Sequence, residues 1–369
     1  MYLTSLTLND FRIIKKCDLE FSKGVTAFIG DNGQGKTSIL ESIFWAGHCK
    51  SFRHVSNDLI IKNDAVSSHI RINLSDDIRP QDIVATINRV GRDVILVNGQ
   101  RLKKIKDLLG TLRVTIFTPD DLEIIKGSAT LRREAIDDTL LQVSKKFVAA
   151  NNDYLRILKQ KNALLKSGNP DINVLSVLND SLVMSGSQII KGRLAGLSRM
   201  RKFLSNSYSH VGGDKNNVDV QYQSKIFLNE VFENLDVEEI MLLFSKSIEE
   251  NSDNEFRRYH SVVGPHRDDY LFTISERDSR TQASQGEQRT MALALKMALH
   301  SLIVDMTGDN PILLLDDVFS ELDTGRTHRL VECLPATQTF VTSANEIPSS
   351  LKVDQTFYVK DGMVNKNEK

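Results

Sequence analysis

Apolar and polar residues alternate in several short stretches of the first third of the chain. Leu6 and Leu8 begin the pattern, which recurs at Ile70, Ile72 and Leu74, at Ile83, Ala85 and Ile87, and at Val94 and Leu96. A period of two places successive side chains on opposite faces, so these stretches predict half-buried β-strands. Asn98-Gly99 after the last stretch predicts a hairpin turn. The block from Met1 to about Phe117 is therefore expected to be rich in strands.

Continuous apolar runs occur near both ends of the chain. Val25–Ile29 and Val114–Phe117 predict buried strands, and Thr118-Pro119 stops the second of them. The C-terminal block predicts an alternating strand, a long helix and two further buried strands, at Tyr270–Ser275, Glu287–Asp305, Ile312–Leu315 and Thr339–Thr342. Both ends of the chain thus predict an α/β fold.

The middle of the chain has a helical period instead. Leu131–Lys166 contains neither proline nor glycine, and apolar residues recur there at alternating spacings of four and three. This pattern predicts a single helix of about 36 residues, roughly 54 Å long at 1.5 Å per residue. Further helical runs are expected at Asn173–Leu204 and Phe227–Ile248, separated by a turn at Gly212-Gly213-Asp214. The block predicts a short helical arm.

A glycine-rich segment, Gly30–Thr37, lies between the predicted strand Val25–Ile29 and a predicted helix at Ser38–Ala46. It fits the phosphate-binding pattern GxxxxGK[ST] in the strand–loop–helix context that this pattern requires. The glycines let backbone N–H groups turn towards phosphates, Lys36 adds a positive charge, and the Thr37 hydroxyl can ligate Mg²⁺. A nucleoside triphosphate with Mg²⁺ is the expected ligand.

Two carboxylates, Asp316 and Asp317, end an apolar strand near the other end of the chain. Asp316 is expected to hold the metal or its water, and Asp317 stands where a water-polarising base is needed. Lys36 and Asp316 are about 280 residues apart. We therefore expect a large insertion, with the two chain ends closing into one head.

A third element, Ala283–Gln288, opens the predicted C-terminal helix. Its Ser284, Gln285 and Gly286 could bind an anion through a hydroxyl and backbone N–H groups, although an ordinary helix cap uses the same residue types. Because the chain already has one triphosphate loop, we expect these three residues to contact the nucleotide bound by a second copy of the chain. Two heads would then enclose two nucleotides.

Composition sets wider bounds on the function. The chain of 369 residues is 40% hydrophobic and 26% charged, as in soluble globular proteins. No apolar run is expected to span a membrane, and no signal peptide is expected at the N-terminus. Three scattered cysteines predict reduced thiols and a cytoplasmic location. With a net charge of −1, any nucleic-acid binding has to use local patches.

Charge is uneven along the predicted arm. Leu131–Lys202 holds thirteen Lys and Arg against six Asp and Glu, whereas Phe203–Arg257 holds four against eleven. The basic half indicates either solvated helix faces or a sequence-independent track for a phosphate backbone. The candidates for such a track are Arg132, Arg133, Lys145, Lys146, Arg193, Arg199, Arg201 and Lys202.

The segments GDNGQGKTS from Gly30, ASQGEQ from Ala283 and LLLDDVFSELD from Leu313 resemble the ABC-type ATPase heads of the SMC and RecF group. Within that group the chain is similar to the RecF family over Leu3–Val364. The similarity is carried by Asn9–Arg12, Lys50–Arg53, Phe117–Leu122 with Gly127 and Arg132-Arg133, and Gly264–Asp269. The family usually has Gly and Thr where this chain has Tyr259 and Ser261. Thr342-Ser343-Ala344 occupies the place of a histidine found in many ABC heads, as is usual for RecF.

The resemblance implies a role for each motif residue. The phosphates and Mg²⁺ are expected at Gly30, Asp31, Asn32, Gly33, Gln34, Gly35, Lys36, Thr37 and Ser38. Arg12 is expected near the phosphates, Asp316 in the metal's shell, and Asp317 as the catalytic carboxylate. Ser284, Gln285 and Gly286 are implied to reach the γ-phosphate bound by a partner. The implied domains are an ATPase head formed by residues 1–118 and 258–369 and a helical arm formed by residues 119–257.

RecF-like proteins are ATP-dependent DNA clamps, so the resemblance also implies a function. They bind ATP, dimerise, bind single-stranded, gapped and duplex DNA, and hydrolyse ATP slowly as weak DNA-dependent ATPases. With RecR and RecO they help to load recombinase at gaps, and they support DNA replication, repair and the SOS response. Asp317 is one methylene shorter than the Glu that transporter ATPases usually have, which favours a slow switch over a fast motor.

Two alternatives belong to other classes of protein. The ATPase subunit of a membrane transporter shares the loop and the acidic strand, but it is expected to match LSGGQ more closely than Ala283–Gln288 does. An SMC-like structural tether needs hundreds of heptad residues, which this arm does not have. ATP-dependent dimerisation, measured with and without DNA, discriminates between these classes.

Overall fold

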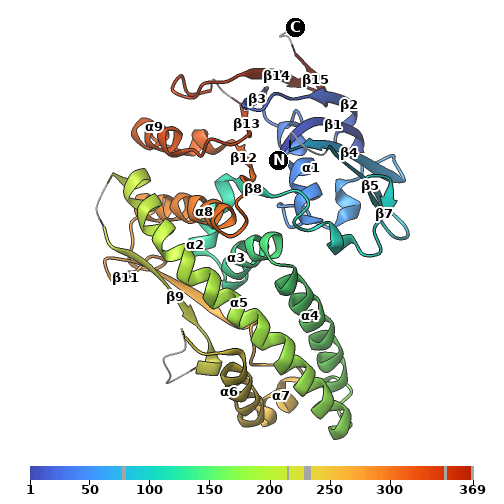
Figure 1. The fold of residues 1–369 in the computed structure, drawn as a ribbon, viewed down its shortest axis with the longest axis vertical. Coiled ribbons are helices and arrows are strands. Elements are labelled where there is room, and N and C mark those ends of the chain that lie inside the picture. Colours follow the sequence, from blue (N-terminus) through green and yellow to red (C-terminus); the bar gives the residue numbers. More distant parts are fainter. Residues whose placement is uncertain (77–79, 214–215, 228–233, 345–346, 367–369) are drawn as a thin grey trace. The chain divides into compact units, whose positions relative to one another are not determined.

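The computed structural model describes residues 1–76, 80–213, 216–227, 234–344 and 347–366 (Figure 1). The chain forms two compact units. The first comprises Met1–Asp121, Ser207–Lys215 and Ala292–Lys369, and the second comprises Leu122–Asn206 and Asn216–Met291. The functional domain boundaries implied at 118/119 and 257/258 divide the chain at other positions and stay a prediction.

An antiparallel sheet in the first unit contains the strands that alternation predicts. Its order is β2-β1-β4-β5-β6-β7, and its strands are β1 Tyr2–Phe11, β2 Ile14–Glu20, β4 Ser67–Ser75, β5 Gln81–Asn88, β6 Val94–Val97 and β7 Gln100–Arg101. The alternating apolar side chains, such as Leu6, Ile72 and Ile83, are buried on one face. Asn98 and Gly99 have φ of 50° and 76°, as the predicted hairpin turn requires.

The second sheet of the first unit joins the two ends of the chain. Its order is β15-β14-β3-β13-β12-β8, with β3 Val25–Ile29, β8 Val114–Phe117, β12 Ile312–Asp316, β13 Thr339–Ser343, β14 Gln355–Lys360 and β15 Met363–Asn365. β3 lies between β13 and β14 and is parallel to both. The rings of Phe28, Phe340 and Phe357 stack across these three strands. The predicted closure of both chain ends into one α/β fold is therefore confirmed.

Helix α1 (Lys36–His48) lies between the two sheets. Its Ile39, Leu40 and Ile43 are fully buried in a core that also contains Leu6 of β1 and Phe340 of β13. Shorter elements complete the unit: α9 (Thr324–Cys333) and the 3₁₀ turns Asn57–Ile60, Ile105–Leu108, Pro119–Asp121 and Val318–Glu321. Packing on both faces explains why α1 is buried almost all round, its polar Glu41 and Ser42 included.

Helix α8 (Gln285–Thr307) corrects one expectation from composition. In the described part of the chain, it is a helix long and apolar enough to cross a membrane by length and composition, so the expectation of no such run is wrong. However, 67% of its apolar window is buried. Leu293 and Met297 pack with Leu313 and Leu315 of β12. This burial is typical of the core helix of a globular protein.

The helices of the second unit differ from the prediction at one serine. The expected single helix over Leu131–Lys166 is wrong, because Ser144 is extended (φ −136°, ψ 106°) and separates α3 (Ala129–Val143) from α4 (Lys145–Leu165). The Ser144 hydroxyl accepts a hydrogen bond from the Phe147 N–H, which caps α4. The longest helix is instead α5 (Ile172–Gly212), with 41 residues.

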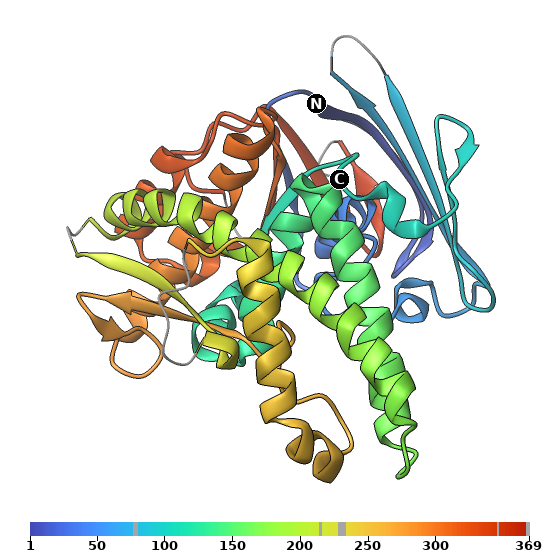
Figure 2. The same ribbon diagram turned by 60° about the horizontal axis from the view of Figure 1, so that its bottom comes forward.

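Helices α4 and α5 run side by side (Figure 2). Glycines on α5 allow close approach: a Cβ on Gly192 would lie 2.7 Å from the Phe147 ring, and one on Gly196 would lie 2.9 Å from Leu140 of α3. The apolar seam predicted from spacing is confirmed as packing, since Ile136, Phe147 and Tyr154 are buried. The break at Ser144 leaves that seam intact.

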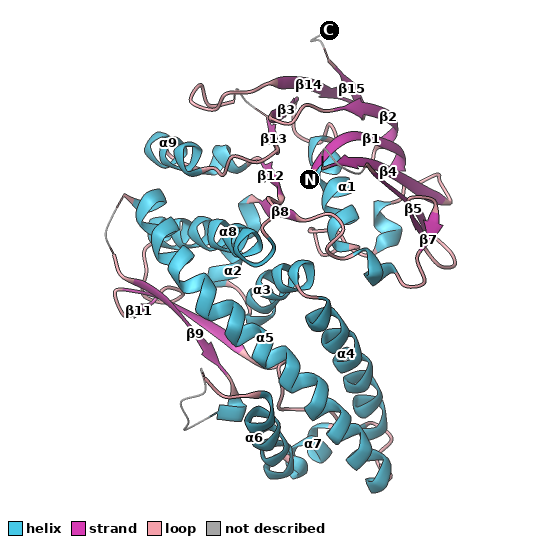
Figure 3. Ribbon diagram, viewed as in Figure 1, coloured by secondary structure: helices cyan, strands magenta, loops and turns pink. Residues whose placement is uncertain are grey.

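The rest of the second unit mixes short helices and a small sheet (Figure 3). A helix over Phe227–Ile248 is expected, but Phe227 belongs to a 3₁₀ turn, residues 228–233 lie outside the described residues, and α6 spans Val237–Glu250. Asp236 and Glu239 form a capping box that starts α6. Asp214 of the predicted turn also lies outside the described residues. The remaining elements are α2 Leu122–Lys126, α7 Ser252–Arg258, β9 Val218–Gln223, β10 Asp269–Ile274 and β11 Arg277–Asp278.

Candidate functional site

Three parallel strands of the first unit end at the same edge of their sheet. Gly30 follows β3, Asp316 ends β12, and Thr342 lies near the end of β13 between them. Thr342 is in register with Asp316 on one side and with Phe28 on the other. The carboxyl ends of parallel strands are where ligands bind in open α/β sheets. The strand order therefore brings together two motifs that are distant in sequence.

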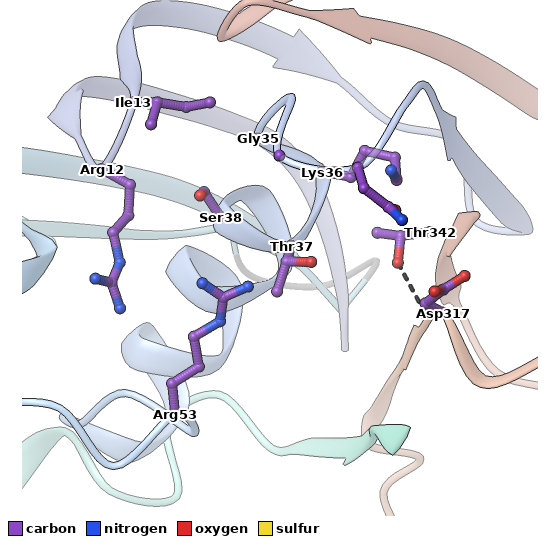
Figure 4. Close-up of a pocket in the computed structure, with 11 residues that line it drawn as sticks. Arg12, Ile13, Gly35, Lys36, Thr37, Ser38, Arg53, Asp317 and Thr342 are labelled. Atoms are coloured by element: carbon purple, nitrogen blue, oxygen red, sulfur yellow. Dashed lines mark hydrogen bonds between the residues drawn. The ribbon is translucent and has the colours of Figure 1, made fainter. Parts of the chain in front are cut away.

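A cavity of about 320 Å³ opens at this edge (Figure 4). Eight of the residues expected to form the site line it: Arg12, Asn32, Gly33, Gly35, Lys36, Thr37, Ser38 and Asp317. Ile13, Arg53 and Thr342 line it as well. Gly30, Asp31, Gln34 and Asp316 do not line the cavity, although all four lie in or next to the two motifs.

Lys36 is directed back into its own loop. Its Nζ donates hydrogen bonds to the carbonyl oxygens of Gly30 (2.5 Å) and Asp31 (2.8 Å). Burial lowers the pKa of Lys36, while the nearby carboxylates of Asp317 and Asp316 act in the opposite direction. A cation held by backbone carbonyls inside a glycine-rich loop is positioned for an anionic ligand.

Asp316 joins the loop to the acidic strand. Its Oδ1 accepts hydrogen bonds from the Thr37 hydroxyl (2.9 Å) and from the Thr342 hydroxyl (2.7 Å). Burial raises the pKa of Asp316, and these two hydrogen bonds oppose that rise. Threonine and aspartate oxygens within hydrogen-bonding distance of each other form the kind of oxygen pair that Mg²⁺ accepts.

Asp317 is held by its backbone rather than by its side chain. It has a left-handed φ of 50°, and its N–H donates to the Thr342 hydroxyl at 3.0 Å (Figure 4). A non-glycine residue in this region carries strain, and such strain is concentrated at functional sites. The turn presents the Asp317 side chain to the cavity that Lys36 also lines.

Arg12 lines the cavity but is already engaged. Its guanidinium donates to both carboxylate oxygens of Glu41, at 2.9 and 2.5 Å, and to the Leu59 carbonyl at 2.8 Å. The Glu41 side chain is fully buried, so Arg12 compensates a charge that would otherwise be costly. The contact between Arg12 and a phosphate stays a prediction.

Arg53 is a cavity residue that the motif analysis does not single out. It is exposed and lines the cavity, and among the residues that the structure describes its guanidinium forms no ion pair. Its charge also acts on Asp316, whose pKa it lowers. Arg53 lies in Lys50–Arg53, a segment that carries the resemblance to the RecF family. It is not part of the phosphate-binding pattern, so that pattern does not predict its place in the cavity.

The chain was compared with protein families and with individual proteins. A family model described as the RecF/RecN/SMC N terminal domain matches residues 2–363. The DNA replication and repair protein RecF of Clostridium tetani is 34% identical over 98% of this chain and 99% of its own length. RecF of Streptococcus suis is 35% identical, with full coverage of both chains. The chain belongs to the RecF family.

Solved structures agree with this assignment. A structure of the recombination mediator protein RecF with ATP, in the RecFOR pathway, has a TM-score of 0.92 at 30% identity, covering 100% of this chain and 98% of that one. An SMC head bound to the C-terminal winged-helix domain of ScpA has a TM-score of 0.55 at 18% identity. The similarity to the SMC head, at 18% identity, is evidence for the fold alone. The expected α/β ATPase head of the SMC and RecF type is confirmed.

The turn at Ser284 lies in the second unit and is built as a helix cap. The Ser284 N–H donates to Glu287 Oε2 at 2.8 Å, and the Glu287 N–H donates to the Ser284 hydroxyl at 3.3 Å. The hydrogen bond from the Ser284 N–H lowers the pKa of Glu287. Ser284 and Gln285 are exposed. The turn fits both an ordinary helix cap and an anion site. Its contact with the nucleotide of a second copy stays a prediction.

Two of the basic residues considered for a phosphate track are buried ion-pair partners. Arg132 has 3% of its side chain exposed and pairs with Asp269 at 2.6 Å. Arg193 has 4% exposed and pairs with Asp137 at 2.7 Å. A phosphate backbone cannot reach these buried guanidiniums, so neither a solvated helix face nor a phosphate track describes these two residues. Lys145, Lys146, Arg199 and Lys202 are exposed.

The structure explains the departure from the family pattern at Tyr259 and Ser261. Tyr259 ends α7 in a left-handed conformation, φ 56° and ψ 27°, which glycine adopts without steric cost. The Ser261 hydroxyl donates to Glu255 Oε1 at 2.7 Å, and the other Glu255 oxygen pairs with Lys161 at 2.7 Å. The chain thus accommodates a tyrosine in a left-handed turn, and Ser261 supplies a hydroxyl to the buried Glu255.

Proposed function

We propose that this protein is an ATP-switched DNA clamp of recombinational repair. The observation that carries the proposal is the cavity at the ends of β3, β12 and β13, where Lys36, Thr37 and Asp317 face a common space. Relatives named as DNA replication and repair proteins match it over the whole chain, and a similar structure is that of a RecF with ATP. This combination favours the clamp over a transporter subunit or a structural tether.

ATP would bind through the loop Gly30–Ser38. Its phosphates would displace the Gly30 and Asp31 carbonyls as partners of Lys36, with the N-terminus of α1 adding its dipole. Mg²⁺ would be held by Thr37 and by Asp316 or a water on it. No cluster of three or more His, Cys, Asp or Glu side chains suited to a metal occurs among the described residues. That is expected for Mg²⁺ bound largely by phosphates and water.

Hydrolysis would be slow and would depend on Asp317. Its carboxylate faces the cavity, and its backbone is fixed on Thr342, so it can polarise a water near the terminal phosphate. Ser284, Gln285 and Gly286 would reach the γ-phosphate of a second copy. The exposure of Ser284 and Gln285 at a capped helix start supports such a contact. The chain would then be a weak ATPase whose closed form is a homodimer.

DNA would be bound mainly through its phosphate backbone. Of the residues considered for a phosphate track, Lys145, Lys146, Arg199 and Lys202 are exposed. Contacts of this kind are independent of sequence and sensitive to salt. Single-stranded, gapped and duplex DNA are all proposed ligands, and RecR and RecO are the proposed partners in the cytoplasm, in support of replication and the SOS response.

The test is the mass of the protein with ATP and Mg²⁺, measured by light scattering with and without gapped DNA. Wild type should bind ATP and dimerise, and DNA should strengthen the dimer. Lys36→Ala should lose ATP binding and with it the dimer, because the phosphates lose their main point charge. A dimer of unchanged stability in Lys36→Ala would refute the assignment of the phosphate loop.

Ser284→Arg separates binding in cis from closure in trans. The variant should bind ATP as a monomer and fail to dimerise, because a bulky cation would obstruct the partner's γ-phosphate without touching Gly30–Thr37. Its DNA affinity should weaken, and the salt dependence should flatten because fewer phosphates are neutralised. A variant that dimerises like wild type would show that this turn does not act in trans.

A further inference from the structure

Gln34 connects the phosphate-binding loop to a turn near the C-terminus. Its side-chain Oε1 accepts a hydrogen bond from the Asp361 N–H at 2.5 Å, and its backbone carbonyl accepts one from the Gly362 N–H at 3.0 Å. Asp361 and Gly362 form the turn between β14 and β15. One residue of the loop is thus held at its side chain and at its backbone by two consecutive N–H groups.

The glycines of the loop contact the same hairpin. A Cβ on Gly30 would lie 2.1 Å from the Val359 carbonyl oxygen of β14. A Cβ on Gly35 would lie 3.7 Å from the Gly362 Cα and 3.2 Å from the Ile13 side chain. Gly362 in turn has φ 74°, and its own Cβ would lie 2.6 Å from the Ile13 carbonyl oxygen. The loop therefore packs between the β1–β2 turn and the β14–β15 turn, with no room for a Cβ at Gly30 and little at Gly35.

The hydrogen bonds between Gln34 and the hairpin lie outside the cavity. Gln34, Val359, Asp361 and Gly362 do not line it, whereas Gly33, Gly35 and Lys36 do. Asp31, Asn32 and Gly33 are exposed, so the outer half of the loop has little packing of its own. A loop rich in glycine loses much conformational entropy when it is ordered. Contacts made before the ligand arrives reduce that loss on binding.

We propose that the β14–β15 hairpin is a positioning element for the phosphate-binding loop, and that Gln34 is the positioning residue through which it acts. The proposal rests on the proposed function, because it concerns the affinity of that same loop for nucleotide. It gives the last strands of the chain a role beyond completing the sheet. The hairpin orders the loop, and no group of the hairpin touches the nucleotide.

Two variants remove the connection in different ways. Gln34→Met keeps the length of the side chain but removes the acceptor for the Asp361 N–H. Gly362→Ala adds a Cβ that collides with the Ile13 carbonyl and so displaces the turn. Each should weaken the binding of both ATP and ADP about threefold to tenfold, the effect of losing one hydrogen bond or its geometry. At saturating ATP, Gly362→Ala should hydrolyse ATP at the wild-type rate.

Two matched controls separate positioning from general destabilisation. Gly99→Ala introduces a Cβ at φ 76°, nearly the φ of Gly362, at a β-turn where that Cβ meets nothing within 4 Å. It should lower thermal stability through the same backbone strain and leave nucleotide affinity unchanged. Asp361→Gly keeps the N–H that Gln34 accepts and should also bind nucleotide like wild type.

The readouts are ATP and ADP titrations with Mg²⁺ and amide hydrogen exchange of residues 31–36 without nucleotide. Exchange should accelerate in Gln34→Met and Gly362→Ala and stay unchanged in both controls. If wild type binds ATP while both variants bind it equally well and exchange no faster, the positioning role is refuted and the proposed function stands. If wild type binds no ATP, the proposed function itself fails. Equal losses of affinity in Gly99→Ala would show a structural effect only.

Discussion

Charged side chains are used differently in the nucleotide cavity and in the core of the second unit. The cavity is lined by Lys36, Arg53 and Asp317, and Lys36 is held there by backbone carbonyls rather than by a carboxylate. In the second unit, Lys161 is fully buried and pairs with Glu255, and Arg193 pairs with Asp137 while donating to the Pro265 carbonyl. Tyr222 donates a short hydrogen bond to Asp268, whose pKa burial raises to about 6. One region presents charge to a ligand, and the other neutralises charge internally.

The difference shows what a basic motif residue can and cannot indicate. Arg132 and Arg193 look like a phosphate track in the sequence, yet the carboxylates that neutralise them lie far away in the chain or on another helix. Removing one partner of such a pair leaves an uncompensated buried charge, whereas removing a cavity charge leaves the fold intact. Variants of the buried pairs should therefore lower stability, and variants of the cavity charges should lower activity without lowering stability.

The largest expected effect is on stability, in Glu255→Ala. Lys161 has no exposed side-chain area, so the variant should lower the free energy of unfolding by about 3–5 kcal/mol in urea denaturation. Glu250→Ala is the matched control, because Glu250 and Lys246 are both largely exposed and 4.0 Å apart. That change should cost less than about 1 kcal/mol. Equal effects of the two variants would contradict the distinction between buried and surface pairs.

Asp317→Asn should show the reverse behaviour. Hydrolysis should fall about 100-fold, since a side chain that assists proton transfer contributes at least that much. ATP binding, dimerisation and the unfolding midpoint should stay at wild-type values, because only the group facing the water is changed. The measurements are phosphate release and ATP titration. Loss of ATP binding would instead place Asp317 among the metal ligands.

A buried histidine without a partner should make the first unit sensitive to acid. Neither ring nitrogen of His300 on α8 has a hydrogen-bond partner among the described residues, and burial lowers its pKa from 6.5 to about 4. The folded state thus binds the proton more weakly than the unfolded state, so stability is lost as pH falls from 6.5 towards 4. The loss between pH 7 and pH 5 should be about 2 kcal/mol.

Urea denaturation across the pH range should show that His300→Leu removes only the part of the loss that His300 contributes. His266 also has its pKa lowered to about 4 by burial, and it remains in the variant as an internal reference. Its Nδ1 lies 2.6 Å from the Tyr154 hydroxyl, so it belongs to the satisfied network of the second unit. An unchanged pH profile in His300→Leu would assign the acid sensitivity to that network instead.

The smallest expected effect is a gain in stability from Tyr259→Gly. Tyr259 is 51% exposed, so little packing is lost, and the left-handed backbone no longer carries a Cβ. The free energy of unfolding should rise by about 1 kcal/mol or less, since the added freedom of glycine in the unfolded chain offsets part of the relief. Tyr259→Ala keeps the Cβ and should show no gain. A gain in both variants would attribute the effect to the ring.

Local patterns in the sequence predict the strands and the nucleotide loop well. Val25–Ile29 and Val114–Phe117 are strands with the predicted limits, and Asn98-Gly99 forms the predicted turn. These features depend on neighbouring residues, whose periodicity and turn preferences are visible in sequence. The phosphate pattern is equally local, so Lys36 and Thr37 are found where the motif places them.

What depends on distant partners is not visible in that way. The break at Ser144 replaces one continuous helix by two, because a single hydroxyl caps α4 while the apolar spacing continues across it. β9 is revealed only by its pairing with β10, which lies about fifty residues later. Arg53 lines the cavity, whereas Arg193 is buried against Asp137, a partner on another helix that its local sequence does not indicate. Burial by another part of the chain decides between the two roles.

The position of β3 between β13 and β14 has a consequence for synthesis on the ribosome. β3 is complete at Ile29, but both strands that flank it begin only at Thr339 and Gln355. At a synthesis rate of about 5–20 residues per second, β3 has no partner strand on either edge for roughly 15 to 60 s. During that time the phosphate loop that follows β3 lacks its hydrogen-bond partners Asp316 and Gly362. Until residues 355–365 have been made, the phosphate loop therefore lacks the hairpin contacts that hold it in the folded protein.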